Sequence, residues 1–359
     1  MNTWGHNIRL SIFGESHGKA VGMVLDGFPA GERIDMEQLE REMERRAPGR
    51  DPYSTARREE DKVEIFSGLH DGKTTGSPIC GVIRNKDSHS ADYGTKFRPG
   101  HADWTAFLKY GGHADMRGGG HFSGRLTAPL VFAGAVAKQL LARRGVKIYG
   151  RLAAAGGIAD PQIPREKSDW EALSRLKFPA SEAAGEKMRE AIRLAKEDGD
   201  SVGGVVETVA FGVPGGLGDP FFASLESRIA ALFFSIPAVK GVEFGDGFPL
   251  SALRGSEAND EIYAEDGRIF ARSNHNGGIL GGISNGMPIL VRAAVKPTAS
   301  IALLQQTVDA ADLRNAELQT KGRHDPCIAP RATPVLEAAL ALCVLDCCAP
   351  NPVCTENGK

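Results

Sequence analysis

Short runs of apolar residues, bounded by glycine or polar turns, recur along the chain and predict β-strands. Residues 8–13 and 20–26 form such a pair on either side of the glycine-rich turn 14–18. Further strands are predicted at residues 63–67, 79–84, 146–154, 203–211, 237–244 and 289–296. The pattern therefore predicts β-structure over the whole length of the chain.

Other segments carry apolar residues at helical spacing. In residues 35–46 they recur on one face, and Asp35 is placed to cap the first turn. Residues 126–144 are apolar on most sides and end at Gly145 after two arginines, which predicts a long buried helix. Further helices are predicted at residues 182–198, 222–234 and 334–347.

Strands and helices follow one another without a regular β-α-β repeat. This mixture favours an α+β or layered arrangement over a doubly wound parallel sheet. Residues 156–200 are rich in charge, and we expect them on the surface of the same domain. No Pro-rich or Ser-rich linker interrupts the chain. We therefore expect one domain over residues 1–348 and a flexible tail over residues 349–359.

The composition is typical of a globular protein: of 359 residues, 42% are hydrophobic and 25% are charged. A formal net charge of -2 gives no reason to expect binding to nucleic acid or to an anionic membrane. No apolar run reaches about 18 residues, and no signal peptide is recognisable, so we expect a cytoplasmic protein without a membrane span. The six cysteines are expected to be reduced thiols, and their spacing predicts no metal site.

Many of the 44 glycines lie in five of six polar clusters. Glycine in a loop lets the backbone approach a ligand and expose its N–H groups to anionic oxygens. Because each cluster also contains Arg, His, Ser or Lys, together they predict a site for phosphates or for a flat cofactor. The clusters are GESHG (14–18), RPGHAD (98–103), KYGGHADMRGGGHFSGR (109–125), SNHNGGILGGISNG (273–286), KPTAS (296–300) and KGRHDPC (321–327).

Histidine and arginine concentrate in and beside these clusters. His17 and His101 stand among glycine and small or acidic residues, and histidine is the natural proton donor near neutral pH. Arginine binds carboxylates and phosphates with two parallel hydrogen bonds. Arginine beside glycine-rich turns therefore predicts a site for a small polyanion. For Arg57 and Arg58, a solvated and salt-bridged surface is an equally good interpretation.

Other catalytic motifs fit poorly. Two segments match the nucleophile elbow G-x-S-x-G, around Ser16 and Ser284, but that motif needs a strand, a tight turn and then a helix. Here a strand-like segment follows each serine. The sequence contains no P-loop, no G-x-G-x-x-G between a strand and a helix, and no zinc-protease motif. A serine hydrolase and a Rossmann-type nucleotide domain are therefore disfavoured.

Taken in order, the motifs resemble those of the chorismate synthase family. The resemblance extends from about residue 5 to about residue 346 and rests on GESHG, RRAPG, RPGHAD, RGGG, GGILGGISNG, KPTAS and GRHDPC. It implies the fold of that family, which is a single-domain β-α-β sandwich with long core helices between antiparallel sheets. It also implies a homotetramer.

The resemblance implies an anti-1,4-elimination as the activity. The family removes phosphate and the C6 hydrogen from 5-enolpyruvylshikimate 3-phosphate and forms chorismate, the last common step toward the aromatic amino acids. Reduced FMN (FMNH2) is required without net redox change. The flavin is thought to lend electron density to the departing phosphate and to recover it when the hydrogen leaves. Reduction by NADPH on the chain itself and reduction by a separate flavin reductase both stay open.

Site residues follow from the resemblance, position by position. His17 would protonate the leaving phosphate, His101 would lie beside the reduced flavin ring, and Asp325 would help the flavin N5 take the C6 proton. The phosphate and the two carboxylates of the substrate would be bound by Ser16, Arg46, Arg50, Arg98, Arg125 and Arg323. The flavin would contact His121, Phe122, Ser123, Ala238, Gly281, Lys296, Pro297, Thr298, Ala299, Ser300 and Arg323.

The chain departs from the family pattern in places. At 121–122, His and Phe replace Arg and Ser of the usual RSSARET. Pro52 occupies a position usually held by an arginine, which Arg50 is placed to replace, and Ala114 stands where another arginine is usual. Two alternative functions therefore stay open: another flavin-dependent phosphate-eliminating enzyme, and a non-catalytic flavin-binding relative.

Overall fold

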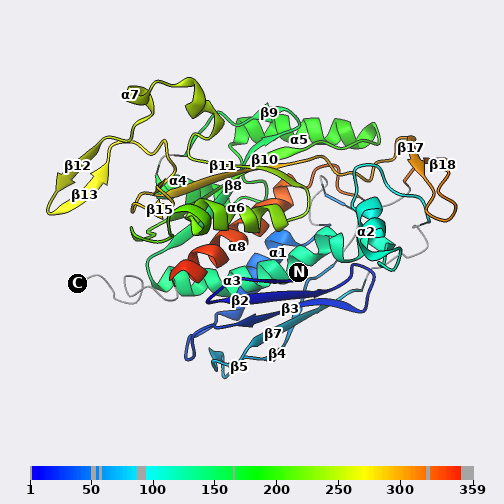
Figure 1. The fold of residues 1–359 in the computed structure, drawn as a ribbon, viewed down its shortest axis with the longest axis horizontal. Coiled ribbons are helices and arrows are strands. Elements are labelled where there is room, and N and C mark those ends of the chain that lie inside the picture. Colours follow the sequence, from blue (N-terminus) through cyan, green and yellow to red (C-terminus); the bar gives the residue numbers. More distant parts are fainter. Residues whose placement is uncertain are drawn as a thin grey trace.

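Two antiparallel sheets face each other across a layer of long helices (Figure 1). The computed structural model describes residues 2–49, 54–55, 59–86, 94–164, 166–320 and 324–348. This arrangement confirms the predicted α+β sandwich with core helices between antiparallel sheets. The predicted tail, residues 349–359, lies outside the described residues.

The first sheet has the strand order β1-β2-β3-β7-β4 and is antiparallel throughout. Side chains of a strand alternate between the two faces of a sheet, and Val21, Met23 and Leu25 of the third strand accordingly point into the core. The strands are β1 (Thr3–Trp4), β2 (Arg9–Gly14), β3 (Ala20–Asp26), β7 (Ile79–Arg84) and β4 (Val63–Ser67).

The second sheet has the order β11-β16-β10-β8-β9 and is also antiparallel. Its register shifts between Val205 and Val206, where the pairing of β10 with β8 is irregular. The strands are β8 (Lys147–Ala155), β9 (Ile158–Ala159), β10 (Gly204–Phe211), β11 (Val239–Phe244) and β16 (Ile289–Val295).

The helical layer contains α1 (Met36–Arg46), α3 (Thr127–Arg143), α6 (Leu225–Ser235) and α8 (Ala329–Cys348). The helices α3 and α8 are apolar on nearly all sides, which is typical of helices enclosed by a core. They approach closely, because a Cβ on Gly134 would lie 2.2 Å from the Cβ of Ala338. The side chain of Asp35 caps α1 by accepting a hydrogen bond from the N–H of Gln38, as predicted.

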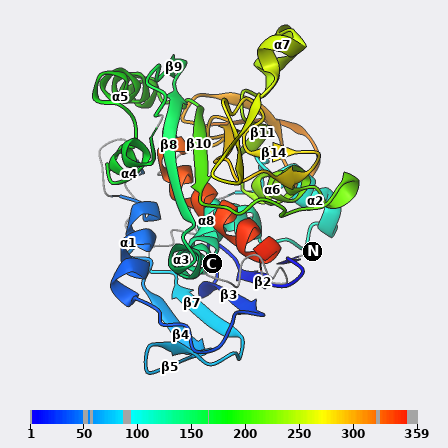
Figure 2. The same cartoon turned by 90° about the vertical axis from the view of Figure 1, so that its left-hand side faces the viewer.

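The remaining elements surround this sandwich. Figure 2 shows α4 and α5 on the outer side of the second sheet, beside β8 and β9. They are α2 (Asp103–Tyr110), α4 (Lys167–Ser174), α5 (Glu182–Glu197), α7 (Gly255–Ala258), and the hairpins β5 (Leu69–His70) with β6 (Lys73–Thr74), β12 (Ile262–Glu265) with β13 (Arg268–Ala271), β14 (Ile279–Leu280) with β15 (Ile283–Ser284), and β17 (Gln305–Val308) with β18 (Asn315–Leu318). Short 3-10 turns lie at Arg117–Phe122, Gly124–Leu126, Phe221–Ala223 and Phe248–Ala252.

Most predicted elements lie where the sequence placed them, and the differences have physical causes. The helix predicted at 334–347 begins earlier, at Ala329, because the packing of α8 against the second sheet outweighs the missing N–H of Pro334. The helix α2 was not predicted, since it is short and most of its side chains are exposed. Among the described residues, no helix is both long and apolar enough to cross a membrane.

Candidate active site

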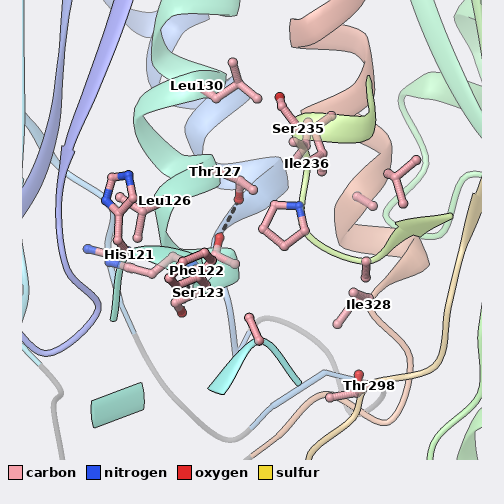
Figure 3. A pocket seen from close by; sticks show the side chains of 18 of the residues that line it. His121, Phe122, Ser123, Leu126, Thr127, Leu130, Ser235, Ile236, Thr298 and Ile328 are labelled. Atoms are coloured by element: carbon pink, nitrogen blue, oxygen red, sulfur yellow. Dashed lines mark hydrogen bonds between the residues drawn. The ribbon is translucent and has the colours of Figure 1, made fainter. Parts of the chain in front are cut away.

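A cavity of about 950 Å³ opens between the start of α3, the end of α6 and the loops before α8. Figure 3 shows Leu126, which ends the 3-10 turn before α3, and Leu130 of α3 on one wall, and Ser235 and Ile236 on the facing wall. Five of the six polar clusters contribute residues to its lining. The cavity therefore gathers segments that are far apart in the sequence.

The turn that carries His17 packs against the glycines of RGGG. It follows β2, and the N–H of Ser16 donates to the carbonyl oxygen of Gly120 over 3.0 Å. A Cβ on Gly118 would lie 2.4 Å from Cδ2 of His17, and a Cβ on Gly119 would lie 3.0 Å from Cε1 of His101. Both glycines also have positive φ. Glycine is thus required at these positions, since it lets both imidazoles approach one turn.

Asp103 orients both His101 and Arg98. Its Oδ1 accepts from Nδ1 of His101 over 2.6 Å, and its Oδ2 accepts from Nε of Arg98 over 2.7 Å. Burial opposes ionisation of Asp103, but the hydrogen bonds from Arg98 and His101 outweigh it and hold the pKa of this carboxyl well below its ordinary range. Since the ionised carboxylate needs a donor, Nδ1 of His101 carries a proton, and the ring edge formed by Cε1 and Nε2 faces Gly119.

Asp61 is buried between two arginines that line the cavity. Its Oδ2 accepts from Nη2 of Arg46 over 2.6 Å, and its Oδ1 accepts from Nη1 of Arg125. Burial raises the pKa of Asp61, but the charges of Arg46 and Arg125 outweigh burial and lower it. Burial, opposed mainly by Asp61, lowers the pKa of Arg46 to about 10, so this guanidinium stays charged at neutral pH.

Asp325 lies on the loop that leads into α8 and lines the cavity. Its Oδ2 accepts from Nη1 of Arg331, and its Oδ1 accepts from the backbone N–H of Thr55 over 2.8 Å. Nε of Arg331 in turn donates to the carbonyl oxygen of Arg46 over 3.1 Å. One guanidinium, that of Arg331, therefore connects the carboxylate to the end of α1.

The KPTAS segment (296–300) forms another side of the cavity. Lys296 donates from Nζ to the carbonyl oxygen of Gly100, and Ser300 accepts from Nη1 of Arg98 over 3.4 Å. The hydroxyl of Thr298 is buried and finds no hydrogen-bond partner among the described residues. An orphaned hydroxyl at a cavity wall is a ready contact for a polar ligand.

His121, Phe122 and Ser123 also line the cavity (Figure 3). Hydrogen bonds at both ring nitrogens orient His121. Its Nδ1 lies 2.8 Å from the carbonyl oxygen of Gly14, and its Nε2 lies 3.2 Å from Oδ1 of Asn2. The ring of Phe122 packs against Tyr110, with ring centroids 6.3 Å apart. The departure from the family pattern at 121–122 therefore places an imidazole and a phenyl ring in the wall.

The structure brings most, but not all, of the predicted site residues together. Ala238, Lys296, Pro297, Thr298, Ala299 and Ser300 line the cavity with His17, His101, Asp325 and the arginines 46, 98 and 125. Ser16 is buried beside His17 without lining it. Gly281 lies in the β14–β15 hairpin and is absent from the lining. Arg50, Arg323, Pro52, Arg57 and Arg58 lie outside the described residues.

Several residues of the site show little or no sequence pattern that points to a role. Asp61 stands in the charged run REED, which looks like solvated surface. Asn85 follows β7 in no motif, although it contacts Arg125. Asp103 and Arg331 lie in or near glycine-rich clusters, and that proximity is the only hint of a role.

The structure also bears on the two elbow motifs and on metal binding. Ser16 lies in a turn between two strands, and Ser284 lies in β15 and donates to the carbonyl oxygen of Pro214 over 2.7 Å. Neither serine has the strand–turn–helix setting of a hydrolase nucleophile. In the part of the chain that the structure describes, no cluster of three His, Cys, Asp or Glu residues could hold a metal ion.

The fold and the cavity together define a class of protein. A sandwich of two sheets carries a cavity lined by arginines, two lysines and several histidines. Such a cavity suits a small, strongly anionic molecule and acid–base chemistry on it. The class is thus an enzyme acting on a polyanionic metabolite.

Comparison with known proteins identifies the family. The family model for chorismate synthase matches residues 8–349. Chorismate synthase from Archaeoglobus fulgidus is 51% identical over 351 residues, covering 97% of each chain, and that from Dehalococcoides mccartyi is 47% identical over 349 residues, covering 96% of each. A crystal structure of chorismate synthase superposes with a TM-score of 0.75 at 32% identity, covering 96% of this chain and 92% of the other. The chain belongs to the chorismate synthase family and is a carbon–oxygen lyase.

Proposed function

We propose that the protein converts 5-enolpyruvylshikimate 3-phosphate to chorismate, eliminating phosphate and the C6 hydrogen in the presence of reduced FMN. The observation that carries the proposal is the convergence of five of the six polar clusters on one cavity. Its volume of about 950 Å³ lies near the upper end of the range for ligand cavities, roughly 300–1,000 Å³. A cavity of this size is suited to a substrate and a cofactor side by side.

The arginines suit the three anionic groups of this substrate. Arg46 and Arg125 lie on one wall, and the carboxylate of Asp61 between them accepts hydrogen bonds from both. Arg98 lies on another wall and donates to Asp103. A phosphate and two carboxylates need several cations at different positions, which two separate arginine sites supply. Arg50 and Arg323 would add to them.

The remaining walls suit FMN. Lys296 and the hydroxyls of Thr298 and Ser300 would hold its phosphate, and the hydroxyl of Thr298, which has no partner among the described residues, supports this assignment. His121, Phe122, Ser123 and Ala238 would contact the rest of the cofactor, with Arg323 as a further contact, whereas Gly281 does not line the cavity. A reduced flavin held there would lend electron density to the departing phosphate and recover it as the C6 hydrogen leaves, so that no net oxidation would occur.

The two histidines and Asp325 would take part in the proton transfers of the elimination. His17 would give a proton to the phosphate as its C–O bond breaks, since the turn that carries it adjoins Arg125 through Asn85. His101 would present Nε2 to the flavin ring while Asp103 holds its Nδ1. Asp325, oriented by Arg331, would help to transfer the C6 proton.

An anaerobic assay tests the proposal. Purified protein is mixed with 5-enolpyruvylshikimate 3-phosphate and dithionite-reduced FMN, and phosphate release and chorismate absorbance are followed. Turnover that disappears with oxidised FMN supports the substrate and the cofactor together. A folded protein that binds FMN but gives no turnover would mean that the changes at 121–122 and Pro52 have altered the substrate. Replacing dithionite by NADPH decides between reduction on the chain itself and a separate flavin reductase.

We also propose that residues 1–348 form one domain that assembles as a homotetramer in the cytoplasm. One continuous cluster of buried apolar residues includes side chains from both sheets and from the helices between them, which supports a single domain. Large apolar side chains stay exposed on projecting segments, which supports assembly.

A further inference from the structure

Asn85 connects two parts of the candidate site that no single motif contains. It follows the last residue of β7, and its Oδ1 accepts from Nε of Arg125 over 2.9 Å. Its Nδ2 donates to the carbonyl oxygens of Glu15 and Gly18, over 3.0 and 2.8 Å. These two carbonyls belong to the turn that carries His17. One amide group therefore bridges the histidine turn and the arginine.

The orientation of this amide is fixed by chemistry. Nε of an arginine can only donate, so the atom that faces it must be the amide oxygen. Backbone carbonyls can only accept, so the atom between Glu15 and Gly18 must be the amide nitrogen. The backbone N–H of Asn85 also donates to the carbonyl oxygen of Lys19 over 3.2 Å. Among uncharged side chains, only a carboxamide offers an acceptor oxygen on one side and two N–H donors on the other.

Arg125 and the histidine turn depend on Asn85 to different extents. Arg125 keeps the ion pair of its Nη1 with Asp61 when Asn85 is removed. The turn keeps the bond from the N–H of Ser16 to Gly120 and its own bond from the N–H of Gly18 to Glu15. Removing the Asn85 amide therefore breaks only the direct link between the turn and the guanidinium of Arg125. With that link, the fixed distance between His17 and Arg125 is lost.

We propose that Asn85 is a positioning residue for the elimination, holding the proton donor His17 at a set distance from the anion-binding guanidinium of Arg125. The inference rests on the proposed function, since it acts through His17. General acid catalysis requires the donor to lie within hydrogen-bond reach of the leaving group, and a displacement of about 1 Å can cost about 100-fold in rate. Asn85→Ala is therefore expected to lower kcat by roughly 10- to 100-fold.

A double-mutant cycle separates this role from a general loss of stability. Asn85→Ala and the isosteric Asn85→Asp are each made in the wild-type chain and in His17→Ala, and kcat is measured anaerobically with reduced FMN. Asn85→Asp can still accept from Arg125 but repels the two carbonyls, so it also serves if the alanine variant fails to fold. We expect either variant to lower kcat in the wild-type background and to change it by less than about 3-fold in His17→Ala, since a coupled pair is non-additive.

Gln139→Ala is the matched control. Gln139 likewise uses its side-chain amide to join two segments, α3 and the start of α1. It accepts from the N–H of Asp35 over 2.8 Å and donates to the carbonyl oxygen of Asp35 over 2.9 Å, but it does not line the cavity. Its loss should affect kcat equally, and only slightly, in both backgrounds. Hydrogen exchange gives a second readout: Asn85→Ala should speed exchange at Ser16 and Gly18 and leave α3 unchanged.

The outcomes distinguish the inference from the proposed function. An equal loss of kcat in both backgrounds overturns the positioning role of Asn85 while leaving His17 as the proton donor. A wild-type kcat for His17→Ala overturns the proposed role of His17 and the inference with it. Unchanged exchange at Ser16 and Gly18 in a folded Asn85→Ala also contradicts the inference.

Discussion

Asp61 and Asp103 lie behind arginine and histidine side chains that line the cavity, and each accepts hydrogen bonds from them. Arg331 lines the cavity itself and donates to Asp325. A buried charge is costly without a partner of opposite sign. Here the partner also fixes the side chain in one rotamer before any ligand binds. Less conformational freedom is then lost on binding, so more of the interaction energy appears as affinity.

The histidines are the first residues to test. His17→Ala and His101→Ala are each expected to lower turnover by roughly 10- to 10³-fold while leaving the fold intact, in the range typical of general acids. The measurement is kcat in the anaerobic assay, with circular dichroism as the check on folding. His70→Ala, which removes an exposed imidazole on β5, is the control and should keep wild-type turnover. If either cavity variant matched the wild type in kcat, the role assigned to that histidine would be wrong.

Arg46→Ala is expected to raise the KM for the substrate, because it removes a cavity cation and leaves Asp61 with Arg125 alone. The exposed Arg41 lies on the same helix and pairs with Glu37 over 3.7 Å, so Arg41→Ala is a matched control with an unchanged KM. Steady-state kinetics at fixed reduced FMN measure both variants. An unchanged KM for Arg46→Ala would move the anion contact elsewhere, with Arg50 as the first candidate.

At the level of elements, a buried group of charges joins the three helices α1, α3 and α8. Glu337 accepts from Nη2 of Arg45 over 2.6 Å and from Nζ of Lys138 over 2.7 Å, and Glu42 contacts both cations. Burial raises the pKa of Glu337, but the charges of Arg45 and Lys138 outweigh it and lower the pKa to about 2. The helices are therefore joined by an ion cluster inside an otherwise apolar layer.

Glu337→Gln is expected to destabilise the fold by about 3–5 kcal/mol, near the lower figure because Glu42 still faces both cations. Since folding lowers the pKa of Glu337, its stabilising contribution is complete above the ordinary value of 4.5 and is lost as the pH falls through about 2. Urea unfolding at several pH values measures both effects.

The difference in unfolding free energy between wild type and Glu337→Gln should shrink as the pH falls from 4.5 toward 2. Glu190→Gln, which breaks an exposed pair with Arg193 on α5, is the control and should leave the unfolding free energy nearly unchanged at every pH. A pH-independent difference for Glu337→Gln would contradict the ionised state of this carboxyl in the folded protein.

Considering the whole molecule, projecting segments expose large apolar side chains. Figure 1 shows the β12–β13 hairpin extending from the body of the sandwich. Ile269 on this hairpin is 73% exposed, and Phe222 and Phe248 are 99% and 82% exposed. Apolar surface on a projecting arm is typical of contacts between subunits. This surface is where we expect the proposed tetramer to form.

Ile269→Asp is expected to reduce the assembly to smaller species, because a charge at a subunit contact must be desolvated. Multi-angle light scattering after gel filtration measures the mass. Ile163→Asp is the control, since Ile163 is 68% exposed on the connection before α4, and it should leave the mass unchanged. A wild-type protein of monomer mass would overturn the tetramer itself.

The sequence by itself determined the local features of this protein. Apolar spacing located the strands and the long helices, because burial of one face imposes the period of each element. The glycine-rich clusters revealed His17 and His101, because a close backbone approach to a ligand needs glycine in the chain itself. The ordered set of motifs indicated the family.

Only the tertiary structure decided which of these parts meet. It placed Gly118 and Gly119 against two histidines, set Asp61 between two arginines and left Gly281 outside the cavity lining. Asp61 and Asn85 act on residues of other segments, and a contact between distant segments depends on packing that leaves no local pattern. For the same physical reason these two residues, unlike those in the glycine-rich turns, could not be recognised from the sequence.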